Sequence, residues 1–305
     1  MRVGRASAAT DTGRRRMQNE DAFICEPPLF AVADGMGGAQ AGELASRLAT
    51  AALAERAAEL RGEEAMAGLV HEANDRIYRH ALGDPASAGM GTTVEAMLVD
   101  EAAGLIAIGH VGDSRAYRVR NGALEQLTTD HSLVGELVRS GRLTPEEAEQ
   151  HPHRSVITRA LGTEAEVQVD TLTVAIEVGD LYLLCSDGLT SMIRDGEILA
   201  VVAGMDGDPA RIADRLVAAA NRAGGEDNVT VVVFEIVAGK PGAREEPATE
   251  EADDTTLEMA LPSPPPAAPP ARRAGAGSGG HWLALTVILL TLAAAAVLVW
   301  WGLAR

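Results

Sequence analysis

Three aspartates lie at the ends of apolar stretches that have the composition of β-strands. Asp34 follows FAVA, Asp187 follows LYLLCS, and Asp227 precedes NVTVVVFEIV. An ionised carboxylate beside a buried strand end is costly unless it is paired or bound to a cation. Three converging carboxylates would suit a hard divalent cation such as Mg²⁺ or Mn²⁺, which prefers oxygen ligands. Because Asp-Gly is also a common turn pair, each aspartate taken alone is explained more simply by an ordinary turn.

The segments around these aspartates form an ordered series of motifs. In chain order they are TDTGRRRMQNEDAF (10–23), ADGMGGAQAGELAS (33–46), GMGTTVEA (89–96), HVGDSRAYR (110–118), the long stretch from DHSLVGEL to RALG (130–162), LLCSDGLT (183–190) and GGEDNVTVVV (224–233). Together they resemble the bacterial branch of the protein phosphatase 2C family. The resemblance covers roughly residues 9–237.

The resemblance implies an α+β fold, a four-layer α-β-β-α sandwich of two antiparallel sheets flanked by helices. A two-metal centre would lie at one end of the sheets. Asp34 would bridge the two ions, Mn²⁺ or Mg²⁺, and the carbonyl of Gly35 would bind one of them. Asp187 and Asp227 would hold the other ion.

Other residues of the same motifs take supporting roles by resemblance. Glu20 and Asp21 would lie beside the centre and act through bound waters, and Arg16 would grip the substrate phosphate in a bidentate fork. Asp113 of GDSR would contribute to a third, weaker metal site. Bacterial relatives commonly supply that site with a second aspartate, but Ser191 occupies its place here. We therefore expect the third site to be weak or empty, since a hydroxyl is a poor ligand for a hard cation.

The implied reaction is metal-dependent hydrolysis of phosphoserine and phosphothreonine on proteins. Two cations about 3.5–4 Å apart lower the pKa of a bridging water, so a bridging hydroxide attacks and no protein nucleophile is needed. Cys25 and Cys185 are then expected to be core thiols. Met36 stands where eukaryotic relatives often carry a histidine proposed to protonate the leaving group. The expected partners are phosphoproteins, Ser/Thr kinases and their substrates among them.

Short strand-like runs and amphipathic segments alternate through residues 1–238, the expected catalytic domain. Runs at 29–33, 92–99, 104–110, 115–120, 181–186 and 228–237 predict strands. Asn121-Gly122 predicts a tight hairpin, because both central positions of that turn need positive φ. Helical spacing of apolar residues predicts helices over 41–53 and around Ile212, Leu216 and Ala220.

The stretch 131–162 resembles the mobile flap of the family. HSLVGELVRSG predicts one short helix, and Thr144 followed by Pro145 predicts the start of a second, with both over the cleft. An ordinary helical hairpin with no role in recognition would show the same pattern. We interpret His131 and the two histidines at 151 and 153 as exposed flap positions, and His110 as a packed, hydrogen-bonded residue.

The composition changes sharply after residue 238. Residues 239–280 hold eight of the fourteen prolines and an acidic cluster, which predicts a disordered linker. Residues 281–305 contain an uncharged run from Trp282 to Leu303 that is long enough, as a helix, to cross a bilayer of about 30 Å. The N-terminus has no apolar stretch of the kind found in secretory signals. We therefore expect a single-pass membrane protein whose catalytic domain is cytosolic.

The net charge of the chain bears on which other functions are plausible. With 44 acidic and 26 basic residues and a formal net charge of -18, the chain is a poor candidate for nucleic-acid binding. A metallohydrolase of nucleotides should show basic or base-stacking features, and the three tryptophans all lie in the C-terminal run. A catalytically weak phosphatase-like module that recruits partners to the membrane is the other alternative. The complete set of metal motifs argues against it.

Overall fold

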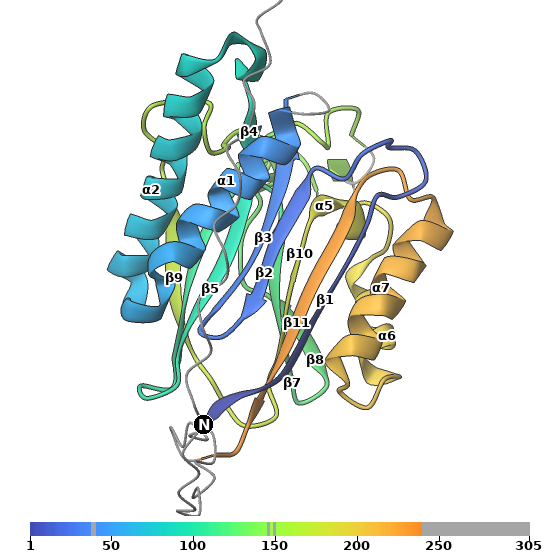
Figure 1. Cartoon of the computed structure of the whole chain (residues 1–305). Coiled ribbons are helices and arrows are strands. Elements are labelled where there is room, and N and C mark those ends of the chain that lie inside the picture. Colours follow the sequence, from blue (N-terminus) through green and yellow to red (C-terminus); the bar gives the residue numbers. More distant parts are fainter. Residues whose placement is uncertain (38–40, 145–146, 149–150, 240–305) are drawn as a thin grey trace, which may run out of the picture. The chain divides into compact units, whose positions relative to one another are not determined.

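Antiparallel strands form two sheets, in which some neighbours follow each other in the chain and others, such as β1 and β11, are far apart in sequence (Figure 1). The computed structural model describes residues 1–37, 41–144, 147–148 and 151–239. The first sheet has the order β1-β11-β10-β7-β8, and the second has the order β2-β3-β5-β6-β9 with the short β4 against β3. The strands are β1 (Arg2–Asp11), β2 (Asp21–Glu26), β3 (Leu29–Met36), β4 (Gly91–Thr92), β5 (Val94–Asp100), β6 (Leu105–Val111), β7 (Arg115–Arg120), β8 (Ala123–Gln126), β9 (Asp170–Ala175), β10 (Leu181–Cys185) and β11 (Val229–Val237).

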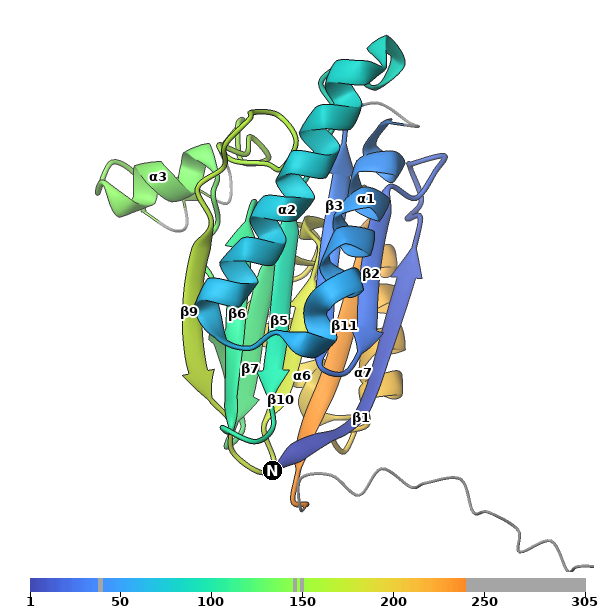
Figure 2. The same cartoon turned by 60° about the vertical axis from the view of Figure 1, so that its left-hand side comes forward.

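Helices cover the outer face of each sheet, as Figures 1 and 2 show. Helices α1 (Ala41–Arg56) and α2 (Gly62–Gly83) lie on the second sheet, and α6 (Asp195–Ala203) and α7 (Pro209–Ala223) lie on the first. The shorter helices are η1 (Ala57–Glu59), η2 (Pro85–Ser87), α3 (Leu133–Arg139) and α5 (Asp187–Thr190). This arrangement confirms the predicted sandwich of two antiparallel sheets flanked by helices.

Three apolar layers hold the sandwich together because successive residues of each strand point to opposite faces. In β11, Val232 and Phe234 pack between the sheets, where Phe234 stacks on Phe30 of β3 with ring centroids 4.0 Å apart. The alternate residues Val231 and Val233 face α7 instead. The same alternation in β3 directs Ala31 toward α1 and α2. Strands covered on both faces explain the continuous apolar runs of the sequence.

Local signals located most of the central strands and the helices α1, α3 and α7, and the hairpin signal was correct. Asn121 and Gly122 have φ values of 52° and 77° and join β7 to β8. Strands β1, β2 and β9 were not predicted. Each forms an edge of its sheet and is only partly buried, so its composition is more polar.

The C-terminal predictions fall almost wholly outside the described residues. The last strand, β11, ends at Val237, and the structure describes the chain only as far as residue 239. The predicted linker (239–280) and membrane span (281–305) stay predictions. Within the described part of the chain, every helix is too short or too polar to cross a membrane.

Candidate metal centre

Asp21 and Asp34 face each other across neighbouring strands. Asp21 begins β2 and pairs in register with Asp34 on β3. Directly opposite residues of an antiparallel pair point to the same side of the sheet, with Cβ atoms about 4.5–5.5 Å apart. Two carboxylates placed in this way repel each other, so the pair needs a cation or a proton between them.

The backbone at Asp34 is held by the two threonines where β4 meets β5. Its carbonyl oxygen accepts hydrogen bonds from the Thr93 amide at 2.9 Å and from the Thr92 hydroxyl at 2.8 Å. Its amide donates to Thr93 Oγ1 at 3.0 Å. The sequence reasoning did not single out Thr92 and Thr93. Two adjacent hydroxyl residues between apolar runs were the available signal.

Gly35 lies where three segments meet too closely for a side chain. A Cβ at this position would overlap the carbonyl oxygen of Gly42 in α1 and would lie 2.6 Å from the carbonyl oxygen of Glu20. The Ser46 hydroxyl in turn donates to the Glu20 carbonyl oxygen at 2.6 Å. The backbone of Gly35 can therefore approach the acidic loop in a way that no other residue allows.

Asp187 and Asp227 reach the same end of the molecule from the first sheet. Asp187 begins α5 just after β10, and Asp227 precedes β11, which pairs with β10. Asp227 Oδ2 accepts a hydrogen bond from Arg16 Nη2 at 2.7 Å. Asp21 links the two sheets, because its Oδ2 accepts from Ser186 Oγ at 2.9 Å and from Thr230 Oγ1 at 2.6 Å.

Asn228 is a positioning residue that the sequence reasoning missed. Its side chain is 4% exposed, and its Oδ1 accepts a hydrogen bond from the Glu20 amide at 2.8 Å. Its Nδ2 donates to the carbonyl oxygens of Thr12 and Gln18, each at 2.9 Å. Asn228, the residue after Asp227, therefore holds both ends of the loop that carries Arg16.

Burial dominates the electrostatics of these carboxyl groups. Burial, and after it the charges of neighbouring carboxylates, raise the pKa of Asp21 to about 7, that of Asp113 to about 7 and that of Asp187 to about 6. The pKa of Asp34 is raised well above its ordinary value, first by burial and then by the charge of Asp21. A hydrogen bond between the carboxyl groups of Asp34 and Asp187 offsets part of the shift for Asp187. This cluster of carboxyl groups therefore lacks enough positive charge to balance it.

Two orphaned oxygens show what the cluster fits. Asp21 Oδ1 and Asp187 Oδ1 are buried, and neither has a hydrogen-bond partner among the described residues. All-oxygen donors with surplus negative charge are the ligands that Mg²⁺ and Mn²⁺ prefer, so the residues fit such an ion. In the described chain, no three His, Cys, Asp or Glu side chains already form a closed ligand set. Asp227 has one oxygen occupied by Arg16.

The predicted site carboxylates lie within electrostatic reach of one another. The charge of Asp227 acts on Asp21, Asp34 and Asp187. Asp113 and Asp187 are coupled in the same way, and Glu20 lies within the electrostatic reach of Arg16 and Asp227. Arg16 is half-exposed and was predicted to grip phosphate, but here it pairs with Asp227. Ser191 is exposed and follows α5, where its amide donates to the Asp187 carbonyl oxygen at 2.8 Å.

The histidine and cysteine predictions had mixed outcomes. His110 is buried and hydrogen-bonded to Glu95, as predicted. His131 is only 2% exposed, so its interpretation as an exposed flap residue was wrong. His153 is exposed and His151 is partly so. Cys185 is buried and Cys25 partly buried, and burial raises the pKa of both thiols, as expected for unreactive positions.

The comparison with known protein families decides the ancestry of this fold. Residues 13–222 match the family model described as protein phosphatase 2C. The chain belongs to the protein phosphatase 2C family. This confirms the resemblance drawn from the seven motifs.

Relatives of the protein phosphatase 2C chain come from several bacteria. It is 44% identical over 238 residues to the serine/threonine protein phosphatase PstP of Mycobacterium tuberculosis, covering 77% of this chain and 45% of PstP. It is 41% identical over 242 residues to the serine/threonine phosphatase Stp of Listeria monocytogenes, covering 75% of this chain and 95% of Stp. This chain therefore matches just under half of PstP but nearly all of Stp.

A solved structure shows the same fold with metal bound. The catalytic domain of the serine/threonine protein phosphatase PstP in complex with two manganese ions superposes with a TM-score of 0.71 at 40% identity. The match covers 77% of this chain and 99% of that one. The carboxylate cluster described above is thus built on a fold that holds manganese in a related protein.

Proposed function

We propose that this protein is an enzyme that hydrolyses phosphoserine and phosphothreonine on proteins with two Mn²⁺ or Mg²⁺ ions. The observation that carries the proposal is the convergence of Asp21, Asp34, Asp113 and Asp187 at one end of both sheets, beside the half-exposed guanidinium of Arg16. Family membership and the names of the relatives support the same activity.

The chain's own residues would divide the work of binding the ions. Asp34 and the Gly35 carbonyl would hold one ion, while Asp34, Asp187 and Asp227 would hold the other, with Glu20 and Asp21 nearby through waters. The tight packing around Gly35 and the threonine hydrogen bonds to the Asp34 backbone fix the main chain that carries these oxygens. When bound, the cations would lower the pKa of a water between them and offset the charge of the phosphoryl group.

Arg16 would bind and orient the phosphate. Its Nη2 is held by Asp227 at 2.7 Å, and half of its side-chain surface remains accessible. The guanidinium is planar and forks toward two oxygens, so it can engage a phosphate while Asp227 limits its movement. Met36 has no acidic hydrogen and does not supply a proton to the leaving group. That proton would come from water or from another residue.

We also propose that residues 281–305 anchor the protein in a membrane, with the catalytic domain on the cytosolic side. The uncharged run from Trp282 to Leu303 supports the anchor, and the proline-rich linker before it supports a tethered domain. From this position the enzyme would oppose Ser/Thr kinases at the membrane, because tethering raises the effective concentration of nearby substrates.

The test is a comparison of substrates and variants with the full chain. We expect hydrolysis of phosphoserine and phosphothreonine peptides with Mn²⁺ or Mg²⁺, and loss of this activity with a chelator. Asp34→Asn should lower kcat by about 10²-fold or more, since a ligand to both ions is neutralised. Asp75→Asn on α2 is the matched control, because within the described residues Asp75 forms an ion pair only with Arg79, at the surface.

Four outcomes would oppose the proposal. Full activity in excess chelator would contradict the metal dependence, and an unaffected Asp34→Asn variant would contradict the site. Inactivity toward phosphopeptides, with binding of a phosphoprotein retained, would favour a non-catalytic recruiting module. Faster turnover of nucleotides or single-stranded nucleic acid than of phosphopeptides would point to the other class of metallohydrolase.

A further inference from the structure

Two short segments, residues 128–133 and 156–161, form the base of the flap region and are called the flap legs here. They lie side by side: the Leu133 amide donates to the Val156 carbonyl oxygen at 2.8 Å, and the Thr158 amide donates to the His131 carbonyl oxygen at 2.7 Å. The second leg is also tied to β4, where Leu161 and Thr92 exchange backbone hydrogen bonds. Movement of one leg would therefore move the other.

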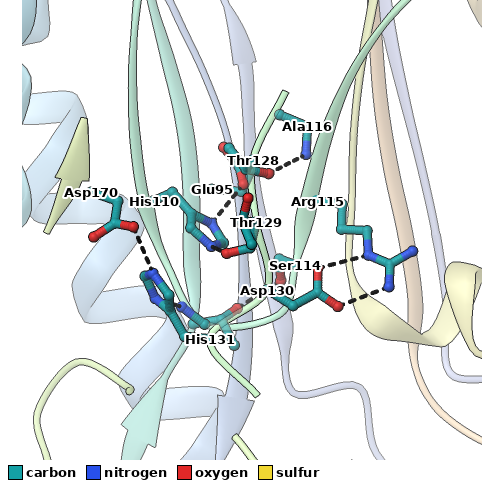
Figure 3. A network of polar contacts seen from close by, with 12 residues as sticks. Glu95, His110, Ser114, Arg115, Ala116, Thr128, Thr129, Asp130, His131 and Asp170 are labelled. Carbon is teal, nitrogen blue, oxygen red and sulfur yellow. Dashed lines mark hydrogen bonds and ion pairs between the residues drawn. The ribbon is translucent and has the colours of Figure 1, made fainter. Parts of the chain in front are cut away.

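His131 joins the first leg to the turn that carries Asp113. The His131 amide donates to the Gly112 carbonyl oxygen at 2.7 Å, and the Gly112 amide donates back to His131 Nδ1 at 3.1 Å. An imidazole nitrogen that accepts from a backbone amide carries no hydrogen. His131 is therefore in the tautomer with hydrogen on Nε2, which lies 3.1 Å from Asp170 Oδ2 (Figure 3).

The surroundings of His131 favour this neutral tautomer. Arg159 Nη1 lies 3.1 Å from His131 Nε2 and donates to Asp170 Oδ1 at 2.8 Å. A guanidinium can only donate, so with hydrogen on Nε2 both groups direct their hydrogens to the Asp170 carboxylate rather than to each other. Burial lowers the pKa of His131 and outweighs the hydrogen bond to Asp170, which raises it; the charges of His110 and Arg159 act in the same direction as burial. The Nδ1 atom thus remains available as an acceptor for the Gly112 amide.

The buried residues Glu95 and His110 form a pair beside the His131 ring. The His110 ring lies with its centroid 4.5 Å from that of His131. His110 Nε2 donates to the Thr129 carbonyl oxygen at 3.0 Å, and His110 Nδ1 lies 2.8 Å from Glu95 Oε2 (Figure 3). Glu95 and His110 are register partners on β5 and β6, so a rigid sheet fixes both the ring and the leg residue Thr129.

The turn that His131 contacts is linked to the metal centre on its other side. Gly112 has a φ of 117°, and a Cβ there would lie 2.6 Å from the Thr93 side chain. Ser114 Oγ lies 2.7 Å from Thr93 Oγ1, which is the atom that accepts a hydrogen bond from the Asp34 amide. The turn that carries Asp113 is therefore bounded by Thr93 and Ser114 on one side and by His131 on the other.

We propose that His131 is a positioning residue of the active site: its Nδ1 acceptor holds the Gly112 amide and so places the Asp113 carboxyl relative to Asp34 and to the flap legs. The inference rests on the proposed phosphatase function for its effect on turnover, but its effect on Gly112 does not. A purely structural role would depend instead on the Nε2 contact with Asp170, which anchors the leg to β9.

Substitution of His131 by asparagine or by glutamine distinguishes the role of its Nδ1 atom from that of its Nε2 atom. In His131→Asn the side-chain oxygen can occupy the position of Nδ1 and accept from Gly112, while the contact with Asp170 is lost. In His131→Gln the amide group reaches the position of Nε2 and can still donate to Asp170, while the acceptor for Gly112 is lost. Both variants replace one ring by one amide, so each is the matched control for the other.

The first measurement is amide hydrogen exchange at Gly112 in the metal-free wild-type and variant proteins, with thermal unfolding to verify folding. We expect exchange at Gly112 to be about tenfold faster or more in His131→Gln than in His131→Asn, because only the former leaves this amide without its acceptor. Equal exchange in the two variants, or faster exchange in His131→Asn, would overturn the proposal. This exchange measurement requires neither enzyme activity nor bound metal.

The second measurement separates kcat from KM with a phosphopeptide and saturating Mn²⁺. We expect kcat of His131→Gln to fall about tenfold or more with little change in KM, since small displacements of active-site groups are costly, and kcat of His131→Asn to stay within about threefold of wild type. The reverse order, or equal losses, would overturn the positioning role. An inactive wild-type protein would instead refute the proposed function, and the exchange arm would still decide the contact with Gly112.

Discussion

Binding of Mn²⁺ to the metal-free protein should release protons below neutral pH. Metal ligands must be deprotonated to bind, and burial raises the pKa of Asp21 and Asp113 to about 7 and that of Asp187 to about 6. At pH 6.5 a group with a pKa of about 7 is about three-quarters protonated. Two such groups and a partly protonated Asp187 together hold between one and two protons, to within roughly one proton. Asp34 adds to this number, because its pKa is raised well above its ordinary value.

The same protons set the pH dependence of stability without metal. A carboxyl whose pKa is raised on folding binds more protons in the folded than in the unfolded state between the two pKa values. The stability that these protons supply is fully present at low pH and is lost as pH rises through the folded pKa. We therefore expect the unfolding free energy of the metal-free protein to fall from about pH 4 to about pH 7, by about 1.4 kcal/mol per pH unit for each excess proton.

Calorimetric titration with Mn²⁺ in two buffers of different ionisation enthalpy measures the proton release directly. We expect about one to two protons or more at pH 6.5 and fewer at pH 8.5, where Asp21, Asp113 and Asp187 are already ionised. Asp21→Asn should reduce the release at pH 6.5, and Asp75→Asn should leave it unchanged. A release that is the same at both pH values, or proton uptake, would refute the assignment of raised pKa values to the ion-binding carboxyls.

Three further predictions test the packing, the third metal site and the anchor. Gly35→Ala should lower the unfolding free energy in urea by about 1–3 kcal/mol, because its Cβ would overlap the Gly42 carbonyl oxygen, whereas Gly68→Ala, with open space around it in α2, should be neutral or stabilising; equal effects would contradict the close packing. Ser191→Asp should shift Mn²⁺ activation of phosphopeptide hydrolysis to lower concentration by completing an oxygen site with Asp113; superimposable activation curves would show that Ser191 has no part in metal binding. A chain ended after residue 238 should be active and leave the membrane fraction in which the full chain sediments; a full chain recovered with the cytosol would contradict the anchor, and an inactive shortened chain would contradict the linker assignment.

Local patterns were enough to locate much of the fold. The apolar runs that became β3, β10 and β11 are buried on both faces, so their composition alone marked them as strands. Strand β1 was missed because it is an edge strand of mixed polarity. Its place is decided by pairing with β11, more than 200 residues away, and a local pattern carries no information about so distant a partner.

The candidate site shows the same division between sequence and tertiary structure. The types of Asp34, Asp187 and Asp227 and their positions at strand ends were compatible with a metal site or with ordinary turns, and the surrounding motifs, by their resemblance to the family, predicted the metal site. Only the structure shows the support of these residues, through the threonine contacts to Asp34, the Asn228 contacts to the arginine loop and the burial of His131. Burial and hydrogen bonding of a polar side chain depend on what other segments bring to it, and the packing of the two sheets decides which segments meet.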